Sequence, residues 1–291
     1  MSSSASQQNA AGGAAENGSG TDVAGIVVFG SICLGTFGLG CWQVQRYNWK
    51  VDLLKTAKER YEMEAQVLPE RKLSQGELYE YLQDISGQRL ALTGSFDHSN
   101  EVRIGPRAAP PGLVTDAAQG MATNPQGYFI VTPFVTKAGG LVFVNRGWVK
   151  RGVENIDRPV GQVTLSNLVV SQTEMPNRFN PPIDQKAINE KSLIWLEANA
   201  LVEAGGASNV LSAGDGVPIV EVVEADGTPL KALYPVARRF QQVSEPSVTP
   251  LTHMTYAFTW FSLAAAGTAM TYYQFRRGRG GRRVRKPKAG P

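Results

Sequence analysis

Two long stretches of the chain are apolar and free of charge. The first, "VAGIVVFGSICLGTFGLGCWQVQ", covers residues 23–45, and the second, "LTHMTYAFTWFSLAAAGTAMTYYQF", covers residues 251–275. A helix that crosses a bilayer needs about 20 consecutive, mostly apolar residues. We therefore predict two transmembrane helices, at 23–45 and 251–275.

Between these stretches, residues 46–250 carry a different pattern. Apolar and polar residues alternate with period two, which is typical of strands with one buried face. Helical spacing is confined to residues 49–66 and 191–206. The strand candidates are residues 87–96, 101–107, 127–136, 141–149, 161–173 and 217–228, and "KAGG" predicts a hairpin turn between the third and fourth. The expected fold is a membrane protein of the α+β class. Its two transmembrane helices flank a mostly antiparallel β extramembrane domain, barrel-like or sandwich, with accessory helices.

The two ends of the chain differ in composition. Residues 1–22 are rich in Ser, Ala and Gly, so we predict a disordered tail; they contain no Arg and do not read as a mitochondrial transit peptide. Residues 276–291 hold eight Arg or Lys and no acid. These eight exceed the net charge of +4, so the rest of the chain is net acidic. A basic run directly after an apolar span is typical of a membrane flank, and nucleic-acid binding is not predicted.

The positive-inside rule assigns a topology to this arrangement. The basic tail, residues 276–291, is expected on the matrix or cytoplasmic side, which places residues 46–250 on the other side. One signal opposes this assignment, because Arg46 and Lys50 follow the first span while only acidic residues precede it. We give more weight to the denser cluster after the second span.

Small residues in the first span suggest a helix contact. Ser31 with Gly35, and Thr36 with Gly40, have the four-residue spacing that lets two membrane helices approach closely. We predict that Gly35 and Gly38 face the small residues 264–269 of the second span. A simple membrane anchor that tolerates glycine would show the same composition.

The sequence offers little for metal or covalent chemistry. Cys33 and Cys41 lie about 12 Å apart along one predicted helix, too far to pair with each other. The adjacent Asp97, His98 and Ser99 cannot form a triad, which needs side chains from separate elements, and they indicate a turn.

The stretch "NRGWV" is expected to have a structural role. Gly147 is expected at a bulge or close backbone approach and Arg146 as a buried donor. We do not expect this protein to be an enzyme.

Several stretches together resemble the surfeit locus protein 1 family of cytochrome c oxidase assembly factors. They are "LGTFGLGCWQVQRYNWK", "GSFDHSNEVRIGPR", "GYFIVTPF", "VFVNRGWVKR", "NRFNPPIDQ" and "HMTYAFTWFSLAAA", in this order and spacing over about residues 34–275. The resemblance implies an assembly factor in the mitochondrial inner membrane, multi-pass, with its central domain in the intermembrane space, or in the plasma membrane of a bacterium. The implied partners are the core subunit of cytochrome c oxidase, its assembly intermediates and haem A synthase. The implied cofactor is haem A, held transiently.

The resemblance also names a candidate site. It makes His253 the axial ligand of the haem iron. In a hairpin of two spans Arg46 would lie level with His253 at the outer surface, where it would be a partner for the haem propionates. Tyr256 and Trp260 lie on the same predicted helix face, where Trp260 could stack on the macrocycle. Each residue has a plainer interpretation: His253 as a hydrogen-bonded interfacial residue, Arg46 as an anchor charge, and the small residues of this face as helix packing.

Two other functions stay open at this point. A scaffold without cofactor could stabilise an early oxidase intermediate through its outer domain. A two-span sensor or receptor with an extracytoplasmic ligand domain would fit the same topology, although residues 1–291 offer no output domain for it.

Overall fold

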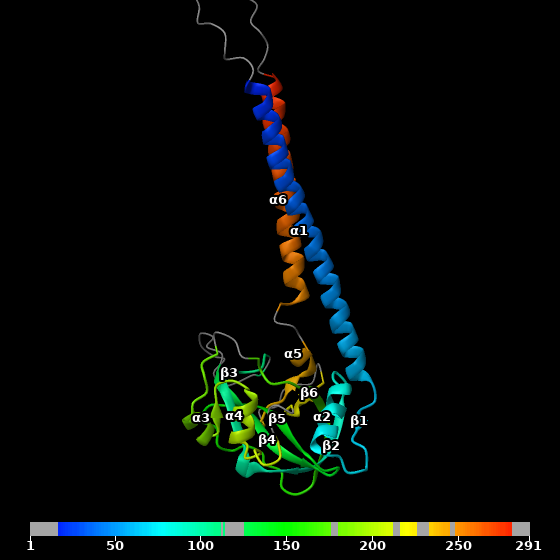
Figure 1. Cartoon of the computed structure of the whole chain (residues 1–291), viewed down its shortest axis with the longest axis vertical. Coiled ribbons are helices and arrows are strands. Elements are labelled where there is room, and N and C mark those ends of the chain that lie inside the picture. The colour runs from blue at the N-terminus through cyan, green and yellow to red at the C-terminus, as the bar shows by residue number, and fades with distance from the viewer. Residues whose placement is uncertain are drawn as a thin grey trace, which may run out of the picture. The chain divides into compact units, whose positions relative to one another are not determined.

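The computed structural model describes residues 17–111, 113, 125–175, 180–211, 216–225, 233–244 and 248–280 (Figure 1). The chain divides into two compact units. One comprises Met1–Leu53 with Pro246–Pro291 and is called the helix pair below; the other comprises Leu54–Glu245 and is called the barrel domain.

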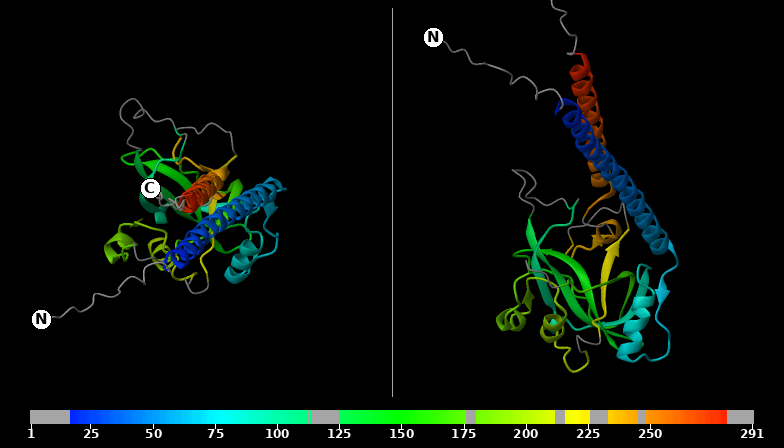
Figure 2. Two further views of the ribbon diagram at one scale, coloured as in Figure 1. Left: turned by 90° about the horizontal axis from the view of Figure 1, so that it is seen from above. Right: turned by 45° about the horizontal axis from the view of Figure 1, so that its top comes forward.

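The helix pair consists of α6, Pro250–Gly280, and of α1, Asn17–Glu62, as far as Leu53; the last turns of α1 belong to the barrel domain. These helices lie side by side in Figures 1 and 2. Helix α1 is longer than predicted at both ends, because residues 17–22 are helical and the expected separate helix at 49–66 continues it without a break. The charge pairs Lys55–Glu59 and Lys58–Glu62, each four residues apart, support its last turns.

Among the described residues, one helix is long and apolar enough to cross a membrane. This is α1 over Ala24–Glu62, with a window of mean hydropathy 1.9. Helix α6 is long and uncharged from Leu251 to Phe275, but its hydroxyl-bearing residues, together with His253 and Gln274, lower its hydropathy. The predicted second transmembrane helix is thus a helix, while its passage through a membrane is not shown.

The barrel domain closes on itself. Strand β2, Leu90–Phe96, pairs with β6, Val163–Ser171, and β6 pairs with β8, Ile219–Glu224. Strand β8 pairs with β5, Leu141–Lys150, which pairs with β4, Gln126–Thr136, and β4 returns to β2. All these pairings are antiparallel except β5 with β8. The mostly antiparallel domain is therefore confirmed, and of the two predicted forms it takes the barrel.

Shorter strands extend the sheet at both ends. Strand β3, Val102–Ala108, pairs with β4, and the two-residue strands β1, Gln66–Val67, and β7, Ser192–Leu193, cover outer edges. A further short strand, β9, Arg238–Arg239, pairs with β8. Such short terminal strands leave little free backbone for edge-to-edge association.

Every strand of the closed barrel contributes to one apolar cluster, which places that cluster in the barrel interior. Its barrel members are Leu90, Leu92, Phe134, Val142, Val144, Leu168 and Val220. Helix α2, Gln75–Asp84, adds the buried Leu78 and Leu82 to the same cluster. Helix α2 was not predicted from the sequence, although Ser74 and Glu77 form a capping box at its start, which is a recognisable signal.

A second cluster lies on the opposite face of β5, where Phe143 alternates with Val142 and Val144. It joins β3 and β7 to helix α4, Ala198–Ala204, whose Leu201 is buried. The predicted helix at 191–206 is therefore partly wrong: its first residues form β7, and only its second half is helical. The described elements are completed by the short helices α3, Gln185–Asn189, and α5, Phe240–Ser244, labelled in Figure 1, and by the 3₁₀ turn His98–Asn100.

The segment that leaves the barrel domain is fixed to its strands. Val236 exchanges backbone hydrogen bonds of 2.8 Å with Trp148. Arg238 donates from two nitrogens to Glu221, whose side chain is completely buried in β8. The ring of Phe240 stacks on Tyr61, near the end of α1, with centroids 4.0 Å apart. The entry and exit of the domain therefore meet.

Candidate functional site

The contact between α1 and α6 follows a regular pattern. The less exposed positions of α1 include residues 33, 36, 40, 43 and 47, and those of α6 include residues 253, 257, 260, 264, 267 and 271. Alternating steps of three and four residues are typical of nearly antiparallel helices packed along one seam. The candidate ligand His253 lies on this seam, one turn from the start of α6.

Small residues set how closely the two helices approach, and of the predicted ones Gly40 and Gly267 lie at the contact. A Cβ at Gly40 would lie 2.5 Å from the ring of Phe261, and one at Gly267 would lie 2.9 Å from Cys33 Sγ. A Cβ at Gly35 or Gly38 would meet nothing within 4 Å. The prediction that Gly35 and Gly38 face α6 is therefore wrong, because both point away from the seam.

His253 makes a polar contact across the seam. Its Nδ1 lies 2.7 Å from Oε1 of Gln43 on α1, and both side chains are half-buried. No other hydrogen bond of this imidazole occurs among the described residues. One ring nitrogen is thus held by the partner helix, which is the arrangement that orients a metal-binding histidine.

Arg46 is not brought to His253 by a described contact. Its guanidinium lies over the ring of Trp49, with Cζ 4.3 Å from the ring centroid, and Lys50 Nζ lies 5.2 Å from the same ring. Arg46 follows Gln43 by three residues, so it lies on the same side of α1, about one turn away. These contacts are compatible with both predicted roles of Arg46, as an interfacial anchor and as a cation at the same height in the helix pair as His253.

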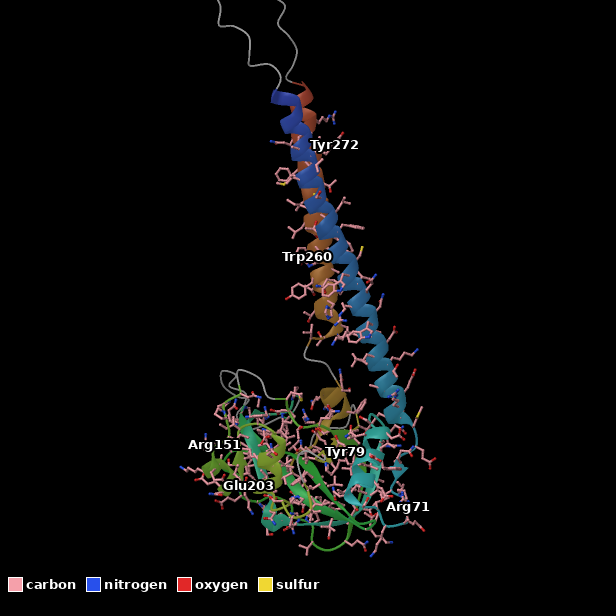
Figure 3. The ribbon with its side chains drawn as sticks, viewed as in Figure 1. Arg71, Tyr79, Arg151, Glu203, Trp260 and Tyr272 are labelled. Carbon is pink, nitrogen blue, oxygen red and sulfur yellow. The ribbon has the colours of Figure 1, made fainter. Side chains whose placement is uncertain are left out.

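The two aromatic candidates lie differently. Trp260, labelled in Figure 3, is half-buried at a seam position of α6. Tyr256 is 53% exposed and lies outside the seam. Of the predicted aromatic pair, Trp260 therefore shares the seam with His253, and no described contact joins either residue to the imidazole.

A shallow apolar groove runs along the seam beyond Trp260. It is lined by Cys33, Leu34, Phe37, Phe261, Ala264, Ala265 and Thr268. The rings of Phe37 and Phe261 meet at its edge, with centroids 5.4 Å apart. The lining contains one hydroxyl and no charge, so the groove suits hydrocarbon rather than a polar ligand.

The barrel domain contains the "NRGWV" motif, and its residues have structural roles. Gly147 has φ +124°, and a Cβ there would lie 2.4 Å from the carbonyl oxygen of Val236, so the motif needs glycine. The register of β4 with β5 shifts at this point, skipping Arg146. The expected bulge and close backbone approach are both present.

Arg146 is buried among charges of the barrel domain. Its Nη1 lies 3.6 Å from Glu101 Oε2, its Nη2 donates to the carbonyl of Asp157, and its Cζ lies 5.1 Å from the centre of the Phe96 ring. Arg158 binds the other Glu101 oxygen at 3.0 Å. Burial lowers the pKa of Arg146, while Glu101 opposes that change. Arg146 is thus a buried structural donor, as predicted.

The stretch from Asp97 to Ser99 is a turn. Asp97 accepts from the backbone N–H of Ser99 at 3.1 Å and from the Asn100 amide at 2.7 Å. Hydrogen bonding by the Ser99 side chain, the largest effect, lowers the pKa of Asp97. His98 instead contacts the carbonyl of Pro159 through Nε2, at 2.9 Å. Within the described ranges no group of three or more His, Cys, Asp or Glu is arranged to hold a metal ion.

Gln43 is the residue of this site to which sequence reasoning gave no role. Its signal is positional: it stands at the end of the first apolar stretch, where the start of the second must lie level with it in a hairpin. Helical spacing from Gly40 and Thr36 then places Gln43 on the seam. The sequence alone did not tell which of Gln43, Gln45 and Arg46 faces His253.

A small closed barrel joined to a long apolar helix, with a histidine held in a helix seam, defines a membrane-anchored α+β protein without a recognisable catalytic centre among its described residues. The SURF1 family model matches residues 31–265, so the chain belongs to the SURF1 family. The resemblance seen in the sequence motifs is confirmed.

Individual relatives agree with this assignment. The chain is 31% identical over 247 residues to a SURF1-like protein of Drosophila melanogaster, covering 82% of this chain and 73% of the relative. It is 28% identical to Surfeit locus protein 1 of Takifugu rubripes, covering 82% and 92%. Surfeit locus protein 1 of Homo sapiens is 27% identical, covering 83% and 74%. Family membership is consistent with a role in cytochrome c oxidase assembly and with a membrane location.

Proposed function

We propose that this chain is an assembly factor for cytochrome c oxidase that carries haem A to the core subunit. The observation that carries the proposal is the His253 imidazole, fixed at Nδ1 by Gln43 across the helix seam. A neutral imidazole nitrogen is a common axial ligand for haem iron. Membership of the SURF1 family supports the same role.

The residues present fit this cargo. His253 offers one nitrogen, Nε2, that no described hydrogen bond occupies, and its other nitrogen has the outer partner that metal-bound histidines need. The groove from Cys33 to Thr268 offers apolar surface on the same seam. When bound, haem A would supply the iron to which His253 binds; Trp260 would offer an aromatic face, and Arg46 a cation for carboxylates.

The proposal includes a membrane arrangement. We take α6 as a second span, because its large apolar side chains point outward: Leu251, Phe258 and Met270 are each more than 70% exposed. The barrel domain would then face the intermembrane space of mitochondria, or the outer side of a bacterial plasma membrane. There it would meet the oxidase core subunit, its assembly intermediates and haem A synthase. The protein would act as a chaperone and not as an enzyme.

The test compares two neighbouring substitutions in the full chain, made in cells that synthesise haem A. His253→Ala removes the ligand, and Met254→Ala is the control, since Met254 lies about 100° around the helix. We expect His253→Ala to lose most of its haem A per protein and Met254→Ala to keep it, measured from the Soret absorption of the purified proteins. Arg46→Ala should weaken binding less, because an exposed charge contributes about 0–1 kcal/mol.

Full haem occupancy with an unshifted Soret band in His253→Ala would overturn the assignment of the ligand. If wild type carries no haem A while His253→Ala still restores oxidase assembly, the scaffold without cofactor is the better function. Absence of any association with oxidase subunits would instead favour a sensor or receptor.

A further inference from the structure

We infer that Gln43 fixes His253 in its Nδ1–H tautomer and so leaves the lone pair on Nε2. The first half of this inference rests on the helix seam alone. The second half, that the lone pair is the one offered to haem iron, rests on the proposed function. Gln43 is therefore a positioning residue, acting on the iron through His253.

The geometry of the contact sets the tautomer. The atom of Gln43 that faces Nδ1 is Oε1, 2.7 Å away. An amide oxygen only accepts, so the hydrogen of this bond must be on Nδ1. A neutral imidazole carries one N–H, and Nε2 is then an unprotonated acceptor. Metal ions bind histidine through such a lone pair.

The other histidine of the chain provides an internal contrast. The chain contains two histidines, His98 and His253. His98 Nε2 lies 2.9 Å from the backbone carbonyl of Pro159, which also only accepts, so the hydrogen of His98 is on Nε2. Its Nδ1 is buried without a hydrogen bond among the described residues. In their neutral forms the two histidines thus hold opposite tautomers.

The contact also links the ligand to the pairing of the helices. Gln43 belongs to α1 and His253 to α6, so the tautomer is fixed only while the seam is closed. A free imidazole interchanges its two neutral tautomers, and part of its population has Nε2 protonated and unable to bind iron. Loss of an outer partner of this kind lowers metal affinity by about 10–100-fold in other proteins.

The first experiment reads the tautomers without any haem. The full chain, labelled with ¹⁵N in its histidines and solubilised in detergent, gives signals from only two imidazoles, and His253→Ala assigns them. We expect protonated Nδ1 with unprotonated Nε2 for His253, and the reverse for His98. In Gln43→Met the His253 signals should move to the average of exchanging tautomers, while those of His98 stay.

Two further variants separate positioning from packing. Gln45→Met makes the same chemical change two residues away on an exposed face of α1, and it should leave His253 unchanged. Gln43→Glu keeps an acceptor at the contact, and it should keep hydrogen on Nδ1. A Nε2–H tautomer in wild type, or unchanged His253 signals in Gln43→Met, would overturn the inference.

The second experiment adds haem A to the same four proteins and measures affinity by Soret titration. We expect binding to fall about 10–100-fold in Gln43→Met and to remain near wild type in Gln45→Met and Gln43→Glu. Equal affinities of wild type and Gln43→Met would contradict the second half of the inference. Failure of wild type to bind haem A would contradict the proposed function. The tautomers measured without haem would still test whether Gln43 sets the tautomer of His253.

Discussion

The helix pair and the barrel domain differ in where they place polar and apolar side chains. In the barrel domain, apolar residues fill the interior, and the buried charges of Arg146 and Glu221 have partners of opposite charge. In the helix pair, large apolar residues such as Leu34 and Phe258 face outward, and the polar contact between Gln43 and His253 lies in the seam. This inversion is expected when one unit is surrounded by water and the other by lipid.

The two units keep their arrangement through different interactions. The barrel domain has a core whose burial stabilises it in water. In the proposed membrane arrangement the helix pair gains nothing from hiding apolar surface, so its arrangement depends on close packing at Gly40 and Gly267 and on the hydrogen bond between Gln43 and His253. Substitutions should therefore act through different physical terms in the two units.

The largest effect is expected in the barrel domain. Arg146→Leu would leave the nearly buried Glu101 with Arg158 as its remaining ion-pair partner. Breaking a buried ion pair costs about 3–5 kcal/mol, and we expect about 3 kcal/mol because Arg158 still offsets part of the charge. The measurement is the urea dependence of hydrogen exchange at the β5 amides. Arg103→Leu, an exposed arginine over Tyr128, is the control and should change stability by less than about 1 kcal/mol. Equal losses of unfolding free energy in the two variants would show that the buried ion pair of Arg146 contributes no more to stability than an exposed arginine.

The next effect is expected in the helix seam. Gly40→Leu places a large side chain where a single Cβ would already lie 2.5 Å from Phe261, while Gly38→Leu fills open space. Overpacking costs about 1–3 kcal/mol, so we expect Gly40→Leu to weaken helix pairing on the order of tenfold and Gly38→Leu to leave it intact.

The native Cys33 on the seam makes the pairing of the two helices measurable. A Cβ at residue 267 would lie 2.9 Å from Cys33 Sγ, so a Gly267→Cys variant with Cys41→Ser should form a disulfide across the seam. The rate of this cross-link reports helix pairing, and Gly40→Leu should slow it. If Gly38→Leu slowed the cross-link to the same extent, Gly38 would face α6, and the assignment of the seam to the Gly40 face of α1 would be wrong.

The smallest effect concerns the cap of α2. A backbone hydrogen bond from Ser74, the largest cause, and the side chain of Arg71 lower the pKa of Glu77 from 4.5 to about 2. A lowered folded pKa means that this stabilisation is complete above pH 4.5, the ordinary value, and is lost as pH falls towards 2. Protection of the α2 amides against hydrogen exchange, relative to the intrinsic rate at each pH, should therefore fall over this window in wild type, and less in Glu77→Gln. Identical pH profiles would show that Glu77 does not stabilise the cap. Figure 3 labels Arg71, which precedes α2, and Tyr79, which lies within it.

Local pattern predicted most of the barrel strands. The sequence pattern gave β2 to β6 and β8 nearly at their observed bounds, because short apolar or alternating runs between turn residues are typical of strands, including β5, which is buried on both faces. Pattern did not tell a barrel from a sandwich, since that depends on β4 returning to β2 across a long sequence separation. It also missed α2, whose short and mostly polar sequence has only two buried leucines.

The candidate site was predicted in part, and the reasons differ by residue. His253 was found because histidine is rare in this chain and stands in an apolar stretch. Its partner was not found, because spacing along α1 gives several possible faces, and only the packing at Gly40 decides that Gln43 faces α6. For the same reason Gly35 and Gly38 were assigned to the contact, although they lie on the opposite side. Haem binding and the membrane passage of α6 stay predictions.

The stacking of Phe240 on Tyr61 has a consequence for chain entropy. The centroids of these rings are 4.0 Å apart, although nearly the whole barrel domain separates them in sequence. An unfolded loop of that length resists closure by about 4–5 kcal/mol, from the logarithmic dependence on loop length. Once the barrel is folded its ends already coincide, and the flanking helices are tethered as if by a short turn. Their encounter then has the high effective concentration of neighbouring segments, and the domain resembles an insertion into a helical hairpin.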